Sequence, residues 1–162
     1  MARTAFETHD HRRCVADGLA AAERHCAARR LQFTASRRRV LEILLEEHRA
    51  MGAYEILDRL RAEGLGAQPP VAYRALDFLT EHGFAHRVEG LNAFIACTHA
   101  GDRHAPAFLI CRSCKRVVEA GVELMAGELG RAARDAGFTI ERSVREAVGL
   151  CPDCAADAGG TS

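Results

Sequence analysis

Residues 69–96 read PPVAYRALDFLTEHGFAHRVEGLNAFIA, and this stretch decides the fold. Prolines in the first turn and Gly83 in the stop position predict a helix over about 70–82. The segments FAHRVE and NAFIAC then alternate apolar and polar residues around a tight turn at Gly90, which predicts a β-hairpin. A helix followed directly by a hairpin is typical of the reading helix and wing of a winged helix-turn-helix.

The chain before this stretch predicts further helices. Residues 13–30 carry apolar side chains at helical spacing, Thr34 offers an N-cap to a second helix, and residues 53–63 form a third that ends at Gly64. A short loop before the last helix completes the pattern of a winged helix-turn-helix, and a generic small helical domain is the alternative. The expected core positions are Val15, Leu19, Ala22, Cys26, Val40, Leu41, Leu44, Leu45, Ile56, Leu57 and Leu60.

The second half of the chain predicts a small α+β unit. AFLIC and KRVVEA read as strands, residues 121–136 as a helix and residues 138–148 as a longer alternating strand, with the final ADAGGTS as loop. We therefore expect one domain over residues 1–90, a second over 91–155 and a tail over 156–162. The apolar members are Val122, Leu124, Met125 and Leu129 of the helix and Phe138, Ile140, Val144 and Val148 of the strand.

Composition excludes some classes of protein. The chain has 22 basic and 22 acidic residues, so nucleic-acid binding must come from a local patch and not from overall charge. The charged N-terminus carries no apolar signal segment, and no stretch approaches the 18 apolar residues of a membrane span. We expect a cytoplasmic protein, where thiols stay reduced, so the seven cysteines point to metal binding or catalysis.

Two C-x-x-C pairs carry the strongest chemical signal. Cys111 and Cys114 follow one predicted strand, and Cys151 and Cys154 follow another. Two such turns bring four thiolates to one ion and leave no open coordination position, so we expect a structural zinc site with four cysteine ligands. An iron–sulfur cluster stays open as the alternative, whereas a redox dithiol needs only one pair.

A second set of possible ligands lies around the junction of the two halves. His86 and Cys97 end the two strands of the hairpin, two histidines follow in a polar loop, and Glu119 lies in the strand after the first cysteine pair. Such residues at the ends of adjacent strands can converge on a tetrahedral ion. Each of them alone is more readily read as an ordinary residue without a metal. The two loop histidines are His99 and His104.

Five stretches of the sequence occur in the order found in the ferric uptake regulator superfamily. They are FTASRRRVLEILLE, AYEILDRLRAE, PPVAYRALDFLTEHGFAHRVE, CRSCKRVVE and CPDC. The chain resembles this superfamily over residues 13–154, and YRALDFL with GFAHRVE and both cysteine pairs resembles its zinc uptake regulator branch most. The resemblance implies an N-terminal winged helix and a C-terminal dimerisation domain. One departure is Val71-Ala72, where the family usually has Thr-Val before its Tyr-Arg, and Val71 cannot donate to a phosphate as a hydroxyl would.

The resemblance also implies two zinc ions per subunit. The branch places its loop histidine seven residues before the first cysteine pair, which selects His104 and leaves out His99. The thiolate of Cys97 favours zinc over the harder Fe²⁺ or Mn²⁺. The implied structural ligands are Cys111, Cys114, Cys151 and Cys154, and the implied regulatory ligands are His86, Cys97, His104 and Glu119.

The function that the resemblance implies is a zinc-responsive repressor. Such a protein would bind palindromic operator DNA as a homodimer, control zinc uptake genes, catalyse no reaction, touch no membrane and take no small molecule besides zinc. We expect Arg74 to contact guanine in a bidentate way, and Tyr54 and Tyr73 to meet thymine methyls or phosphates. Arg37 is expected to hold a phosphate.

Three rival functions stay open from the sequence. A sibling of the same family would respond to iron, manganese or peroxide. A zinc hydrolase or deaminase would need an open metal position and a general base, and the deaminase signature is missing. A scaffold held together by zinc, with no sensing, would bind DNA independently of His86 and Cys97.

Overall fold

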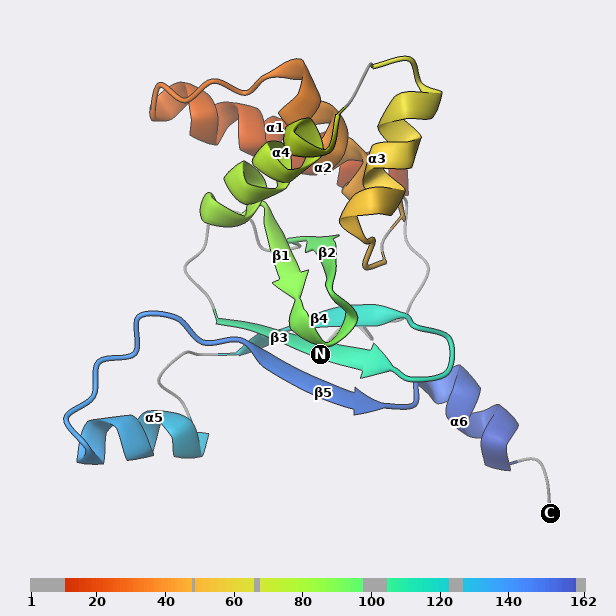
Figure 1. Cartoon of the computed structure of the whole chain (residues 1–162). Helices are drawn as coiled ribbons and strands as arrows, with labels where there is room; N and C mark the ends of the chain where they lie inside the picture. Colours follow the sequence, from red (N-terminus) through yellow and green to blue (C-terminus); the bar gives the residue numbers. More distant parts are fainter. Residues whose placement is uncertain (1–10, 48, 66–67, 98–104, 123–126, 160–162) are drawn as a thin grey trace. The chain divides into compact units, whose positions relative to one another are not determined.

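The computed structural model describes residues 11–47, 49–65, 68–97, 105–122 and 127–159 (Figure 1). The chain divides into a first unit of residues 7–101 and a second unit that includes residues 102–162. This boundary lies after residue 101 and not after 90, because the second hairpin strand pairs with the first and stays in its unit. No helix in the described ranges is long and apolar enough to cross a membrane.

The first unit is a winged helix. β1 pairs with β2 in antiparallel register, with Ala85 opposite Ala96, and we call this hairpin the wing. Met51, in the turn between the second and third helices, exchanges two backbone hydrogen bonds of 2.8 Å with Phe94 of the wing. The elements are α1 His11–Ala28, α2 Ala35–Glu47, α3 Ala53–Ala62, α4 Pro69–Glu81, β1 Ala85–Val88, the 3-10 turn η1 Glu89–Leu91 and β2 Ala93–Ala96.

The ends of these helices follow from local chemistry. The Thr34 hydroxyl accepts a 3.3 Å hydrogen bond from the backbone N–H of Arg37, so it satisfies one of the free donors of the first turn of α2. α4 begins with Pro69, whose missing N–H costs nothing at that position. Gly64 and Gly83 follow α3 and α4 with φ of +74° and +76°, a conformation that glycine adopts without strain.

The core of the first unit is aliphatic and tightly packed. All eleven positions predicted to face inward either are buried or, in the case of Val15, pack against the buried cluster. Gly18 lets α1 approach α2 closely, because a Cβ there would lie 2.8 Å from Cδ1 of Leu45. Burial of these side chains is the main term that stabilises the winged helix.

A chain of ion pairs, which we call the charge lattice, joins α2 to α3. Arg39 makes two hydrogen bonds of 2.7 Å to Glu63 and one of 3.0 Å to Glu46. Arg59 bonds Glu46 at 2.9 Å and also pairs with Glu47. The members of the lattice are Arg39, Glu42, Glu46, Glu47, Arg49, Glu55, Arg59 and Glu63.

The second unit is a three-stranded sheet with a helix near each end (Figure 1). The strand order is β4-β3-β5, with β3 antiparallel to β4 and parallel to β5. Among its described residues the core is small, and its larger buried side chains are Phe108, Ile110, Val117 and Val118. The elements are β3 Ala105–Cys111, β4 Val117–Val122, α5 Gly127–Asp135, β5 Arg145–Gly149 and α6 Pro152–Gly159.

Three predictions about the second unit are wrong in detail. The helix predicted over 121–136 begins at Gly127, because β4 continues to Val122. The strand predicted over 138–148 is limited to Arg145–Gly149, the residues that pair with β3, and Phe138 and Val148 are each 67% exposed. The predicted terminal loop is helical as far as Gly159, because Pro152 starts α6 directly after Cys151 and alanines extend it.

We predict that Arg39→Gln lowers the free energy of unfolding by about 1 kcal/mol or more and the unfolding temperature by a few degrees, because three carboxylates lose a shared cation. Hydrogen bonds from Arg39 lower the pKa of Glu63, and those from Arg49 lower the pKa of Glu55. Carboxylates with a lowered folded pKa add stability above their unfolded pKa of about 4.3, and this stability is lost as the pH falls through the folded value.

Thermal unfolding between pH 7 and pH 3 checks this prediction. The wild type should lose more stability on acidification than Arg39→Gln, which has already lost the ion pairs that Arg39 makes with Glu42, Glu46 and Glu63. Arg13→Gln is the control, because Arg13 is 84% exposed and lies 3.8 Å from Asp17, which is 76% exposed. Identical pH dependence in the wild type and Arg39→Gln would contradict a stabilising lattice.

Candidate metal centres

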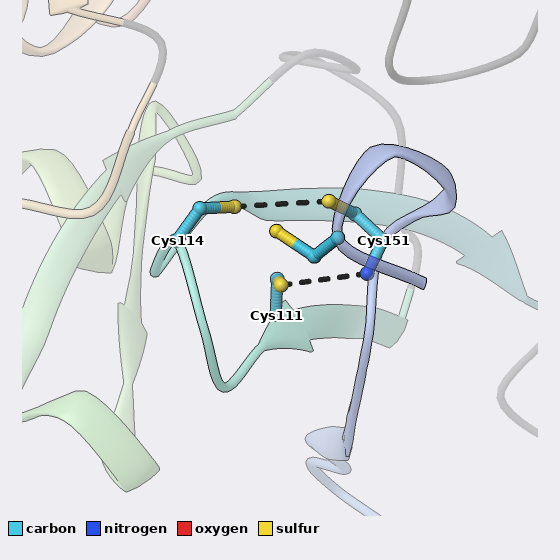
Figure 2. Close-up of side chains that lie close together, drawn as sticks. Cys111, Cys114 and Cys151 are labelled. Carbon is cyan, nitrogen blue, oxygen red and sulfur yellow. Dashed lines mark hydrogen bonds between the residues drawn. The ribbon is translucent and has the colours of Figure 1, made fainter. Parts of the chain in front are cut away.

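Four cysteines of the second unit gather at the ends of β3 and β5, and we call them the cysteine cluster (Figure 2). Cys111 is the last residue of β3, and Cys114 lies in the turn that leads to β4. Cys151 follows β5, and Cys154 lies in α6. Their four sulfur atoms all lie within 4.8 Å of one another, as the spacing of the two pairs predicted.

The backbone shapes each half of the cluster. The turn from Cys111 to Arg116 closes with two hydrogen bonds, from Lys115 N to Cys111 O at 3.0 Å and from Cys111 N to Arg116 O at 2.9 Å. Lys115 has a φ of +63°, which lets the chain reverse directly after Cys114. The backbone N–H of Arg112 donates to Gly149 O at 2.9 Å, so the first turn is held against the strand that leads to the second pair.

Backbone donors favour negative charge on the cluster. The N–H of Cys151 points at Cys111 Sγ at 3.4 Å and, with the N–H groups of Cys114 and Ser113, lowers the pKa of Cys111 to about 6. The pKa of the Cys154 thiol shifts in the opposite direction, because its neighbours Cys151, Cys114 and Cys111 raise it to about 12. Cys111 therefore ionises more readily than Cys154.

The donor set and spacing fit a tetrahedral zinc ion. Zinc–sulfur bonds of about 2.3 Å at tetrahedral angles place the sulfurs about 3.8 Å apart. Cys114 Sγ and Cys151 Sγ lie 3.7 Å apart. All seven cysteines lie in the described ranges, and no disulfide joins any of them there.

An ion pair that sequence reasoning missed lies beside the cluster. Arg116 Nη1 is 3.1 Å from Asp153 Oδ2. Asp153 raises the pKa of the Arg116 guanidinium, and the negative charge of Cys114 and Cys151 adds to that rise. Both residues stand close to predicted ligands in the sequence, but nothing in their separation of 37 positions indicates that they pair.

The structure describes three of the four predicted regulatory ligands. His86 on β1 is half-buried and Cys97, just after β2, is buried. A ring nitrogen of His86 and the sulfur of Cys97 lie within 4.8 Å of each other, and Cys97 N donates to Phe84 O at 2.9 Å. Glu119 belongs to the second unit, where it is buried on β4 opposite Phe108. His99 and His104 lie outside the described residues.

The predicted DNA contacts fall into two groups. Tyr54 on α3 is 67% exposed, Tyr73 on α4 is 43% exposed, and Arg74 on α4 is exposed and forms no ion pair within the described residues. Arg37 is different, because its guanidinium lies 3.8 Å from the ring centroid of Phe78 and donates to the backbone oxygen of Gln32. The first three side chains face solvent, whereas Arg37 already serves the packing of α2 on α4.

Comparisons with known proteins agree on one family. The family model described as the ferric uptake regulator family matches residues 28–144. The zinc uptake regulation protein of Escherichia coli (strain K12) is 41% identical over 138 residues, which cover 84% of this chain and 80% of that protein.

Two solved structures are similar in fold and in sequence. A zinc uptake regulator complexed with zinc and DNA has a TM-score of 0.83 and 37% identity, and the match covers 90% of this chain and 97% of that chain. The crystal structure of holo XcZur has a TM-score of 0.78 and 38% identity, with 86% and 98% covered. These likenesses extend over both units and confirm the predicted fold class.

We predict that Co²⁺ added to the metal-free protein gives the sulfur-to-metal absorption of a tetrahedral thiolate site. Cys111→Ser and Cys154→Ser should each weaken metal binding by roughly a hundredfold, because a quarter of the about 10–16 kcal/mol typical of structural zinc is lost with one ligand. Cys14→Ser is the matched control and should bind normally. Unchanged absorption in both cluster variants would show that the four sulfurs do not share an ion.

Proposed function

This chain belongs to the ferric uptake regulator family, and we propose that it is a zinc-responsive transcriptional repressor. It binds palindromic operator DNA as a homodimer in the cytoplasm and controls zinc uptake genes. The observation that carries this proposal is the 37% identity, over 90% of this chain, with a zinc uptake regulator complexed with zinc and DNA. Regulation and not catalysis is the proposed activity.

The cysteine cluster is the proposed structural site, with one zinc per subunit. Cys111 and Cys114 bind from the end of β3, and Cys151 and Cys154 bind from the start of α6. Zinc supplies the positive charge that lets all four thiols ionise together. Sulfur atoms that already lie within 4.8 Å of one another support this assignment, because little chain movement is needed to bind the ion.

A second zinc per subunit is the proposed signal. His86 and Cys97 contribute from the winged helix, and Glu119 and His104 complete the set from the rest of the chain. The short distance between the His86 ring and the Cys97 sulfur supports the first half of this set. A thiolate among the ligands favours zinc over Fe²⁺ or Mn²⁺, which argues against an iron- or manganese-sensing sibling.

Ligands drawn from both domains give zinc a way to change DNA affinity. A dimer that reads a palindrome must hold its two winged helices at the spacing of the half-sites. Binding through both domains favours the arrangement that has this spacing over those that do not. To move the population from mostly inactive to mostly active, zinc must bind the active arrangement more tightly than the inactive one by about 5 kcal/mol. A four-ligand zinc site can supply a difference of this size.

The DNA-reading surface is proposed on α3 and α4. Arg74 donates two hydrogen bonds to a guanine, and Tyr54 and Tyr73 contact thymine methyls or phosphates. Their exposure supports this role. Arg37 contacts phosphate through whatever donors remain after its hydrogen bond to Gln32, so we assign it the smallest share of the binding energy.

The exposed apolar residues of the second unit support a homodimer. Leu109, Phe138 and Val148 are 44%, 67% and 67% exposed, and Leu129 on α5 is 51% exposed. β5 is an edge strand of its sheet, with one side free of partners among the described strands. Apolar side chains beside an open strand edge are typical of a surface that a second copy covers.

We predict that His86→Ala and Cys97→Ser each hold one zinc per subunit where the wild type holds two. Zinc should no longer raise their affinity for operator DNA, because the signal site is incomplete while the cysteine cluster is intact. Elemental analysis and gel-shift assays at fixed free zinc measure both effects. Cys14→Ser should behave as the wild type, and zinc-dependent DNA binding by the two site variants would favour the scaffold without sensing.

We predict that Arg74→Gln weakens binding to an AT-rich palindromic operator by about 1–3 kcal/mol, roughly 5- to 150-fold, because a bidentate base contact is lost. Binding to unrelated DNA should change much less, since phosphate contacts remain. Fluorescence anisotropy with both DNAs separates these effects. Arg131→Gln on α5 serves as the charge-matched control, and an equal loss on both DNAs would show that Arg74 contacts only phosphate.

A further inference from the structure

Arg116 and Asp153 form an ion pair that joins the two halves of the cysteine cluster. Arg116 lies two residues after Cys114, immediately before β4, and Asp153 lies between Cys151 and Cys154 in the first turn of α6. Their side chains meet at 3.1 Å. The pair therefore crosslinks the turn that holds the first two sulfurs to the helix that holds the fourth.

A cation beside the zinc-filled cluster would stabilise it, because the filled cluster is negatively charged. One Zn²⁺ with four thiolates carries a net charge of about −2, which is costly unless donors or cations surround it. After the hydrogen bond to Asp153, charge on Cys114 and Cys151, one from each half of the cluster, further raises the pKa of the Arg116 guanidinium. The neighbouring cation Lys115 is turned toward the backbone, because its Nζ donates to Arg112 O at 2.9 Å.

We propose that Arg116, oriented by Asp153, is a positioning residue that slows the loss of zinc from the cysteine cluster. The guanidinium offsets the negative charge of the four thiolates, and its bond to Asp153 resists separation of the second cysteine pair from the first. This inference rests on the proposed structural zinc and assigns these two side chains a part in retaining it.

Because the Arg116–Asp153 pair is exposed, its effect is expected in the retention of zinc and not in folding stability. Arg116 and Asp153 side chains are 42% and 74% exposed, and such surface pairs add little to folding stability. Partners that orient metal ligands change metal affinity by about 10- to 100-fold, and exposure places this pair at the lower end. We therefore expect a change in zinc retention of about tenfold without a matching change in unfolding temperature.

The test measures zinc transfer from full-length protein to an excess of a coloured chelator. All variants also carry Cys97→Ser, which disrupts the proposed second zinc site, so that the released zinc comes from the cysteine cluster. Arg116→Gln should release zinc about tenfold faster, and Arg116→Lys should release it at an intermediate rate because the charge remains. Salt should speed release from the parent more than from Arg116→Gln, since added ions screen the guanidinium.

Arg112→Gln is the matched control, because Arg112 lies in the same turn, is exposed and has no ion pair within the described residues. Equal rates for Arg112→Gln and Arg116→Gln would overturn the proposal, because only net charge would then matter. An unchanged rate in both would overturn it as well. In an Asp153→Asn background, Arg116→Gln should have a smaller effect, and a full tenfold effect there would remove Asp153 from the proposal.

The proposed function fails in a different way. If the parent protein binds neither zinc nor Co²⁺ at the cysteine cluster, the structural site itself is absent and no rate can be compared. A parent that binds Co²⁺ with thiolate absorption while Arg116→Gln matches its release rate contradicts the role of Arg116 alone.

Discussion

Four sulfur atoms held within 4.8 Å of one another are the constraint on which the second unit depends. Four thiolates at that distance would repel one another. Backbone N–H donors lower the pKa of Cys111 to about 6, whereas hydrogen bonding to its cysteine neighbours raises the pKa of Cys154 to about 12. A divalent cation removes the repulsion. The described residues of the unit bury only a small core, and β5 must return to pair in parallel with β3. In the proposed function, zinc at the cluster supplies the stabilisation that hydrophobic burial supplies in a larger domain.

The first unit is stabilised by a different means. A tightly packed aliphatic core fixes its helices, and the charge lattice binds α3 to α2. The lattice also accounts for part of the balance between acids and bases, because Arg39, Arg49 and Arg59 are each paired with glutamates. Exposed side chains on α3 and α4 are left to meet the DNA, so local geometry and not net charge carries the proposed binding.

The sequence alone predicted the helices of the first unit and the cysteines that gather in the cysteine cluster. Capping at Thr34, glycine stops and the period of the apolar residues defined the four helices to within about two residues, and the C-x-x-C spacing predicted which sulfurs meet. The strand of residues 138–148 was predicted too long because Phe138 continues the apolar alternation of the strand, although it is exposed and lies before β5. Local pattern cannot tell a core face from a face that another chain covers, and for the same reason it cannot reveal ion pairs such as Arg116–Asp153.

The central claim is that zinc bound at His86 and Cys97, and not at the cysteine cluster, controls DNA affinity. Fluorescence anisotropy of a labelled AT-rich palindrome, titrated with wild-type protein while free zinc is clamped over many decades, tests it most directly. The account predicts weak binding while each subunit holds one zinc, and tight binding that appears together with the second. Full affinity for the palindrome at one zinc per subunit would contradict it.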